Sequence, residues 1–245
     1  MTVFAGLGGV FGKVCYSGYM TPPRRHDMAD HKILPDLPDA HLQAYLTKPL
    51  VAVDCEMHGL RLYRDDLCLI QVCDDEGRVS LVRPQPECPP NLEKLLTHPD
   101  IIKVFHFALS DLGFLKVRYG IDVRPVRCTR VLSKLIRTYS QAHGLKDLCK
   151  ELLGIELDKE QQQTDWMRDD LSTEQLQYAA NDVMHLVRIY RKLEEMIRNR
   201  PPLSTNASVA DLNETAQSMI PGMVELLVHG YGDEDSGWKT TLFSH

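Results

Sequence analysis

Short apolar runs separated by turn-forming residues dominate the first half of the chain. Runs of four to eight residues rich in β-branched side chains are typical of strands. Three of them are separated by short, polar connections, and this spacing favours an antiparallel meander. The strands predicted in this way are Leu50–Asp54, Leu67–Cys73, Val79–Val82, Ile101–Phe105 and Val126–Cys128.

Helical spacing of apolar residues takes over from Ala108 onward. The longest stripe begins at Ser172, which with Gln175 forms a capping box, and it predicts one helix as far as about Ile197. Asn91 is predicted to cap a shorter helix that ends at Thr97. The other predicted helices are His41–Thr47, Ala108–Gly120, Thr129–Thr138, His143–Leu153 and Asp211–His229, the last interrupted at Pro221. A meander followed by alternating strands and helices predicts an α/β fold with a mixed sheet.

Composition divides the chain into a central domain and two appendages. Residues 1–30 are rich in glycine, proline and polar residues and are predicted to be a flexible extension. The central domain is assigned to 31–200, and 201–245 to a C-terminal helix and tail that contribute an oligomer contact. No apolar run reaches the roughly 18 residues that a membrane span needs, so no membrane association is expected. Seven scattered cysteines without a CxxC pair favour reduced thiols and a cytoplasmic location.

Positive charge is concentrated in one segment of an acidic protein. The net charge of the chain is −6, whereas residues 116–150 contain nine Lys and Arg against two acidic residues. A local basic band on an acidic protein is typical of a polyanion held at one place, although solvated helix faces produce the same pattern.

Two carboxylates close the first predicted strand. In the sequence VAVDCE, Asp54 and Glu56 are separated by one residue, so on a strand both point to the same face while Cys55 points to the other. At about 3.3 Å per residue they lie roughly 6–7 Å apart. Like charges at a buried strand need a counter-ion, and a divalent cation is the simplest one.

Two further acidic residues lie in patterns that favour the same site. Asp111 follows His106 just beyond the fourth strand, where α/β proteins place functional residues. Asp111 could equally be an acidic residue that complements a helix N-terminus. Asp182 lies inside the apolar stripe of the long helix, one turn after Tyr178. Unless it reaches solvent at the edge of the stripe, an unpaired aspartate at this position would destabilise the fold, because burying an unpaired charge costs free energy.

These motifs, in this order, resemble the DEDD 3′–5′ exonucleases of the ribonuclease D type. Motif I is Asp54-Cys55-Glu56, motif II is HFALSDLGFL around Asp111, and motif III is YAAND. Tyr178, four residues before Asp182, matches the tyrosine branch of that family. The segment HGLKDLCKELLGIELDKEQQQTDW and the terminal GWKTTLFSH resemble the short ribonuclease D-like proteins called nano-RNase C. The usual threonine of motif I is replaced by Cys55, which is predicted to be a buried spacer.

The resemblance implies a ribonuclease H-like mixed sheet and a two-metal site in an exonuclease domain at 31–200. Two Mg²⁺ or Mn²⁺ ions would be held by Asp54, Glu56, Asp111 and Asp182, with Asp54 bridging both, and Tyr178 would orient the attacking water. Short RNA, including dinucleotides, is the implied substrate, and an octameric ring the implied homo-oligomer. DNA ends or longer RNA remain an alternative, and so does a catalytically silent RNA-binding subunit. The predicted substrate contacts are Leu60, as a wedge against the terminal base, His106, Lys146 and Arg137.

Overall fold

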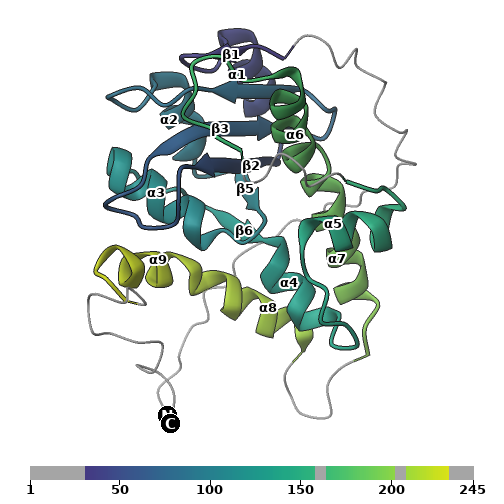
Figure 1. The fold of residues 1–245 in the computed structure, drawn as a ribbon. Coiled ribbons are helices and arrows are strands. Elements are labelled where there is room, and N and C mark those ends of the chain that lie inside the picture. The colour runs from purple at the N-terminus through teal and green to yellow at the C-terminus, as the bar shows by residue number, and fades with distance from the viewer. Residues whose placement is uncertain (1–30, 158–163, 202–207, 232–245) are drawn as a thin grey trace.

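A six-stranded mixed sheet lies at the centre of the computed structural model (Figure 1). The model describes residues 31–157, 164–201 and 208–231. The sheet order is β1-β4-β3-β2-β5-β6. The strands are β1 (Ile33–Leu34), β2 (Leu50–Met57), β3 (Leu67–Cys73), β4 (Val79–Val82), β5 (Ile102–Phe105) and β6 (Val126–Cys128).

The predicted meander and the predicted mixed sheet are both confirmed. Strands β2, β3 and β4 pair antiparallel, whereas β5 pairs parallel with β2 and β6 pairs parallel with β5. Two details differ from the prediction. Strand β2 continues to Met57, so the motif I carboxylates lie within the strand and not after it. The short edge strand β1, parallel to β4, has too few residues to produce a recognisable pattern.

One face of the sheet is covered by α1 (Asp39–Leu46), α2 (Pro90–Leu96), α3 (Leu109–Tyr119) and α9 (Ile220–Val228). Their apolar side chains form one core cluster with Val51 and Val53 of β2. Helix α2 starts differently from the prediction. Asn91 lies inside the helix, and the carboxylate of Asp36 accepts hydrogen bonds from the amides of Asn91 and Leu92. Asp36 therefore satisfies the free N–H groups that an Asn cap would have satisfied.

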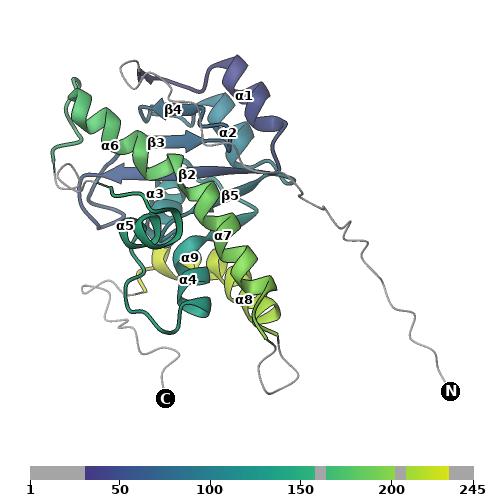
Figure 2. The same ribbon diagram turned by 90° about the vertical axis from the view of Figure 1, so that its right-hand side faces the viewer.

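The other face is covered by α4 (Thr129–Ile136), α5 (Leu145–Leu148), the π-helical turn η1 (Cys149–Leu153), α6 (Thr173–Met184) and α7 (Leu186–Arg198). Helices α6 and α7 lie end to end across the strands (Figure 2). Because side chains alternate along β2, Leu50 and Ala52 join this second core cluster. Ser172 and Gln175 form the predicted capping box at the start of α6.

The predicted long helix is divided in two at His185. This residue has φ −102° and ends the α6 hydrogen-bonding pattern, and its carbonyl accepts the first bond of α7 from Ile189. The apolar stripe continues across the interruption, since Val183 and Leu186 are both fully buried. A break of one residue hardly alters the periodicity, which is why the sequence pattern indicates a single helix.

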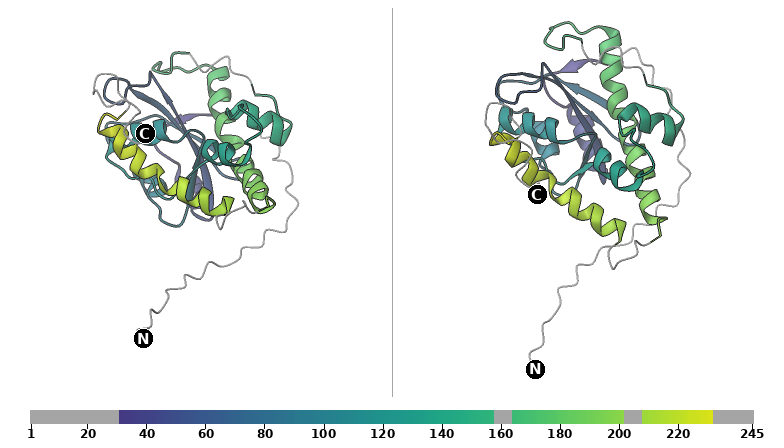
Figure 3. Two further views of the ribbon diagram at one scale, coloured as in Figure 1. Left: turned by 90° about the horizontal axis from the view of Figure 1, so that it is seen from below. Right: turned by 60° about the horizontal axis from the view of Figure 1, so that its bottom comes forward.

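The C-terminal helices α8 (Val209–Ser218) and α9 pack along one edge of the fold (Figure 3). Helix α8 lies against α4 and α9 against α3. The predicted helix 211–229 is therefore two helices that meet at Met219, with Pro221 in the first turn of α9, where a proline is tolerated. The extension 1–30 and the tail with Trp238 and Phe243 lie outside the described residues. Among the residues that are described, no helix combines the length and apolar composition needed to cross a membrane.

Candidate active site

Strand β2 presents Asp54 and Glu56 on the face of the sheet that α6 and α7 cover. Both follow Ala52, which lies in the core cluster on that side, whereas Cys55 lies in the cluster on the opposite side. Cys55 is 6% exposed, as expected of a buried spacer. Glu56 is buried, and Asp54 is partly exposed. The alternation of a single strand is therefore enough to place two carboxylates together.

Helix α6 supplies the third carboxylate. Oxygens of Asp54, Glu56 and Asp182 all lie within 4.8 Å of one another. Tyr178 lies one helical turn before Asp182 and forms a hydrogen bond with it. Helix α6 contacts both β2 and β3, which accounts for the meeting of residues so distant in the sequence.

Asp111 approaches the same group from the first turn of α3. It is 4% exposed, and the backbone N–H of Cys55 donates a hydrogen bond to its carboxylate. Asp111 does not belong to the group of three carboxylates, but its negative charge acts on both Asp54 and Glu56. All four predicted acidic residues therefore converge on one place.

The electrostatics of the site indicate that it needs positive charge. Burial, and then the neighbouring carboxylates, raise the pKa values of Asp54 and Glu56 well above the ordinary range. Burial raises the pKa of Asp111 to about 8. In the part of the chain that the structure describes, no lysine or arginine is among the groups that chiefly set these three pKa values. Carboxylate oxygens are the ligands that Mg²⁺ and Mn²⁺ prefer, so the residues present fit a divalent cation.

These residues line a cleft of about 410 Å³. The cleft contains every predicted site residue except Arg137. It is lined by Asp54, Cys55, Glu56, Met57, Gly59, Leu60, His106, Phe107, Ser110, Asp111, Arg130, Gly144, Leu145, Lys146, Leu157, Tyr178 and Asp182.

Leu60 lies at the mouth of the cleft with its side chain 81% exposed, on the connection between β2 and β3. The preceding Gly59 has φ +121°, and a Cβ there would lie 2.1 Å from a carboxylate oxygen of Asp65. That carboxylate accepts a hydrogen bond from the amide of Arg61. Only glycine fits so close to this acceptor, and the connection thereby holds Leu60 over the site.

His106 and Lys146 lie at the cleft in different environments. His106 is half-buried, and its Nδ1 lies 2.9 Å from the hydroxyl of Thr129. Burial and the nearby Arg130 lower its pKa to about 4, so the ring is neutral at physiological pH. Lys146 is exposed, on α5. Their predicted substrate contacts stay predictions.

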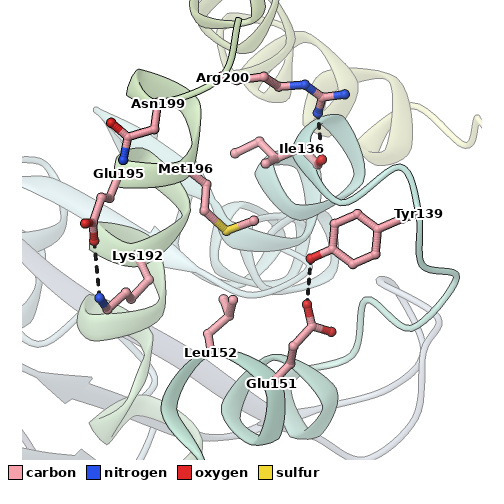
Figure 4. A pocket seen from close by; sticks show the side chains of 9 residues that line it. All are labelled: Ile136, Tyr139, Glu151, Leu152, Lys192, Glu195, Met196, Asn199 and Arg200. Carbon is pink, nitrogen blue, oxygen red and sulfur yellow. Dashed lines mark hydrogen bonds and ion pairs between the residues drawn. The ribbon is translucent and has the colours of Figure 1, made fainter.

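The predicted substrate contact of Arg137 is corrected by the structure, because this side chain is fully buried and does not line the cleft. Its guanidinium forms an ion pair with Glu151 and donates to Ser133 and to the carbonyl of Ala142. These bonds leave it unable to reach a phosphate. Glu151 also accepts a hydrogen bond from Tyr139 at the rim of a separate cavity of about 630 Å³ between α4, η1 and α7 (Figure 4).

Phe107 and Arg130 also line the cleft but do not stand out in the sequence as individual residues. Phe107 lies within the motif II segment, and Arg130 is one of the nine basic residues of 116–150. Their positions in the sequence could have identified them as site residues, since each lies two residues after the end of a predicted parallel strand. Trp166, by contrast, is 2% exposed and packs in the core beside Tyr178.

The strand order and the clustered carboxylates define an exonuclease with a ribonuclease H-like fold. A family model described as 3′–5′ exonuclease matches residues 35–198, and the chain belongs to this family. Its relatives include ribonuclease D-like proteins. Ribonuclease D of Sphingobium indicum is 32% identical over 152 residues, which are 61% of this chain and 39% of the relative. The chain thus spans about two fifths of the length of that relative.

Solved structures extend the similarity over most of the chain. NrnC of Brucella melitensis bound to pGG is 34% identical, with a TM-score of 0.75, and the match covers 88% of this chain and 100% of NrnC. The same protein has been solved with bound Mg²⁺. A structure described as the apo form of the nuclease is 30% identical, with a TM-score of 0.78, and covers 88% of this chain and 98% of its own. The resemblance to the nano-RNase C group is therefore confirmed.

Proposed function

We propose that this protein is a metal-dependent 3′–5′ exoribonuclease that hydrolyses very short RNAs, including dinucleotides, to 5′-mononucleotides. The observation that carries the proposal is the convergence of Asp54, Glu56 and Asp182 within 4.8 Å, with Asp111 and Tyr178 beside them. Four clustered carboxylates, two of them buried and two partly exposed, have no comparable use in a purely structural core, where they would be destabilising.

The carboxylates have distinct proposed roles. Asp54 would bridge two divalent cations, Glu56 and Asp182 would complete one site, and Asp111 would assist the other. When bound, the two cations supply activation of water and neutralise charge on the leaving 3′-oxygen. The backbone N–H of Cys55 helps to hold Asp111 in place for this role.

Tyr178 would orient the attacking water without removing its proton. Burial, and then the charge of Asp182, raise the pKa of this phenol far above its ordinary value. The hydroxyl therefore keeps its proton at neutral pH. Its hydrogen bond with Asp182 places the oxygen beside the carboxylates, where it can accept from or donate to a water molecule.

Two observations support a short substrate. Brucella melitensis NrnC, similar over its full length, was solved with the dinucleotide pGG. The cleft of about 410 Å³ is also in the size range of pockets that enclose small ligands. DNA ends and longer RNA are the alternative substrates, because the cleft residues do not by themselves require a ribose 2′-hydroxyl.

The test is a comparison of 5′-labelled substrates under one set of conditions with Mg²⁺. An RNA dinucleotide, RNAs of increasing length, and single- and double-stranded DNA would be compared, with Asp54→Asn as the inactive control. We expect the highest kcat/KM on the dinucleotide. Preferred hydrolysis of long DNA would overturn the proposal that short RNA is the substrate. If no turnover were sensitive to EDTA, the result would favour a catalytically silent RNA-binding subunit.

We further infer that the protein forms a homo-oligomer through its C-terminal region. Leu212 of α8 and Met219 are 45% and 58% exposed, which supports a contact there. The main apolar residues of α9, Ile220 and Val224, are buried within the same chain. Light scattering on the full chain, with Leu212→Glu as the variant that should dissociate, would test this.

A further inference from the structure

We propose that Phe107 and Arg130 form a stacking subsite for a nucleobase of the substrate, beside the carboxylate cluster. The proposal rests on the proposed exonuclease function. These two side chains would bind a base, whereas the carboxylates of the cleft would act on the phosphodiester.

The topology of the sheet brings these two residues together. Strands β5 and β6 are parallel neighbours, with Phe105 opposite Cys128. Phe107 and Arg130 each lie two residues beyond that pair, so both leave the sheet at the carboxyl ends of their strands. Ligands of open α/β sheets bind at this edge. Strand β2, which carries Asp54, is the parallel neighbour of β5 on its other side. Two strand spacings, about 10 Å, therefore separate β2, which carries Asp54, from β6, which leads into Arg130.

Phe107 has a backbone conformation that a bulky residue rarely adopts. Its φ is +66°, and it is the one non-glycine residue with positive φ within the described ranges. Its ring is 53% exposed, although Phe105 and Ala108 on either side are buried. An aromatic side chain that is both strained and exposed contributes little to the core. Strain of this kind is concentrated at ligand sites.

Arg130 supports the ring of Phe107 from the first turn of α4. Its guanidinium carbon lies 4.4 Å from the ring centroid of Phe107, well within cation–π range. Its Nε is buried without a hydrogen-bond partner. Arg130 also forms no side-chain hydrogen bond or ion pair in the part of the chain that the structure describes, unlike Arg137. The guanidinium is thus held chiefly by the ring of Phe107, at the wall of the cleft.

The chemistry of the pair fits a single-stranded nucleotide. Aromatic rings bind unpaired bases by stacking, and this contact tolerates any base because each has a π-face. A guanidinium beside the ring adds positive charge close to the sugar-phosphate backbone. We therefore expect the subsite to recognise the presence of a base and to discriminate weakly among the four bases.

The first experiment separates KM from kcat on a dinucleotide. Phe107→Leu keeps apolar volume but removes the π-face, and we expect KM to rise about tenfold or more with kcat changed less than about twofold. Phe107→Tyr should restore KM. Tyr139→Leu is the matched control, since Tyr139 is also an exposed aromatic residue beside an arginine, Arg137, but lies outside the cleft. Thermal unfolding of each variant checks that it is folded.

The second experiment uses dinucleotides that lack one base, with the abasic sugar at each position in turn. Removing the base that stacks on Phe107 should raise KM of the native protein, while Phe107→Leu should show no further increase on that substrate. If Phe107→Leu raised KM relative to the native protein by the same factor on the intact dinucleotide and on both abasic substrates, the proposed subsite would be overturned. Normal turnover by the native protein in the same assay would leave the proposed function standing, whereas absence of native turnover would refute that function instead.

Discussion

Asp54 and Asp182 meet in one cluster of carboxylates, although Asp54 lies on β2 near the start of the matched family region and Asp182 lies on α6 near its end. Their carboxylate oxygens lie within 4.8 Å of each other and of Glu56. In the absence of a cation, burial, and then repulsion from Asp111, Asp182 and Glu56, raise the pKa of Asp54 well above its ordinary value. The site is therefore destabilising until a cation is bound.

Removing one charge should abolish activity and stabilise the metal-free protein. Asp54→Asn keeps the size of the side chain but removes a ligand, and we expect hydrolysis of a dinucleotide to fall about a thousandfold or more. Thermal unfolding in EDTA should shift upward by about 3–6 °C because like-charge repulsion is relieved. A lower unfolding temperature for Asp54→Asn in EDTA would contradict this account.

Cation binding should strengthen as the pH rises from 6 to 8. Asp111 has a pKa of about 8 in the metal-free fold, so a proton must leave before it can act as a ligand. Affinity for Mg²⁺ should increase close to tenfold per pH unit for each proton released. Calorimetry at pH 7 in two buffers of different ionisation enthalpy would count the protons. Equal heats in the two buffers would show that the carboxylates are already ionised.

The same pKa shift sets the sign of the pH dependence of folding without metal. Asp111 has a higher pKa folded than unfolded, so the folded state holds a proton that the unfolded state has lost between about pH 4 and 8. The stability contributed by this group is present below pH 4 and is lost as the pH rises through 8. Chemical denaturation in EDTA at pH 6 and 8 should therefore give a lower free energy of unfolding at pH 8, and Asp111→Asn should reduce that difference.

Tyr178→Phe should lower kcat without changing the pH profile. The variant loses the hydroxyl that orients water, and we expect kcat to fall about a hundredfold while Mg²⁺ affinity changes little. Because the pKa of Tyr178 lies above its ordinary range, the native enzyme should show no ionisation of this group between pH 7 and 9. An alkaline limb present in the native profile and missing in Tyr178→Phe would instead identify the phenolate as a base.

Arg137 and Lys146 form a matched pair that separates stability from substrate binding. Arg137→Met should destabilise the fold by about 2 kcal/mol, less than for a wholly buried pair because the side chain of Glu151 is 40% exposed. The KM of the folded fraction should stay unchanged. Lys146→Met should leave stability within about 0.5 kcal/mol and raise KM about threefold to tenfold. If fully folded Arg137→Met showed a raised KM, Arg137 would again be a candidate phosphate contact.

The sequence by itself determined five of the six strands, the mixed character of the sheet and the four carboxylates with Tyr178. These features depend on local periodicity: alternation along β2 places Asp54 and Glu56 on one face, and one helical turn joins Tyr178 to Asp182. Only the tertiary structure decided which basic residues reach the cleft. Arg137 and Arg130 look alike in the basic band, yet one is buried against Glu151 and the other lies over Phe107. That choice depends on strand register and helix packing between distant segments, which no local pattern encodes.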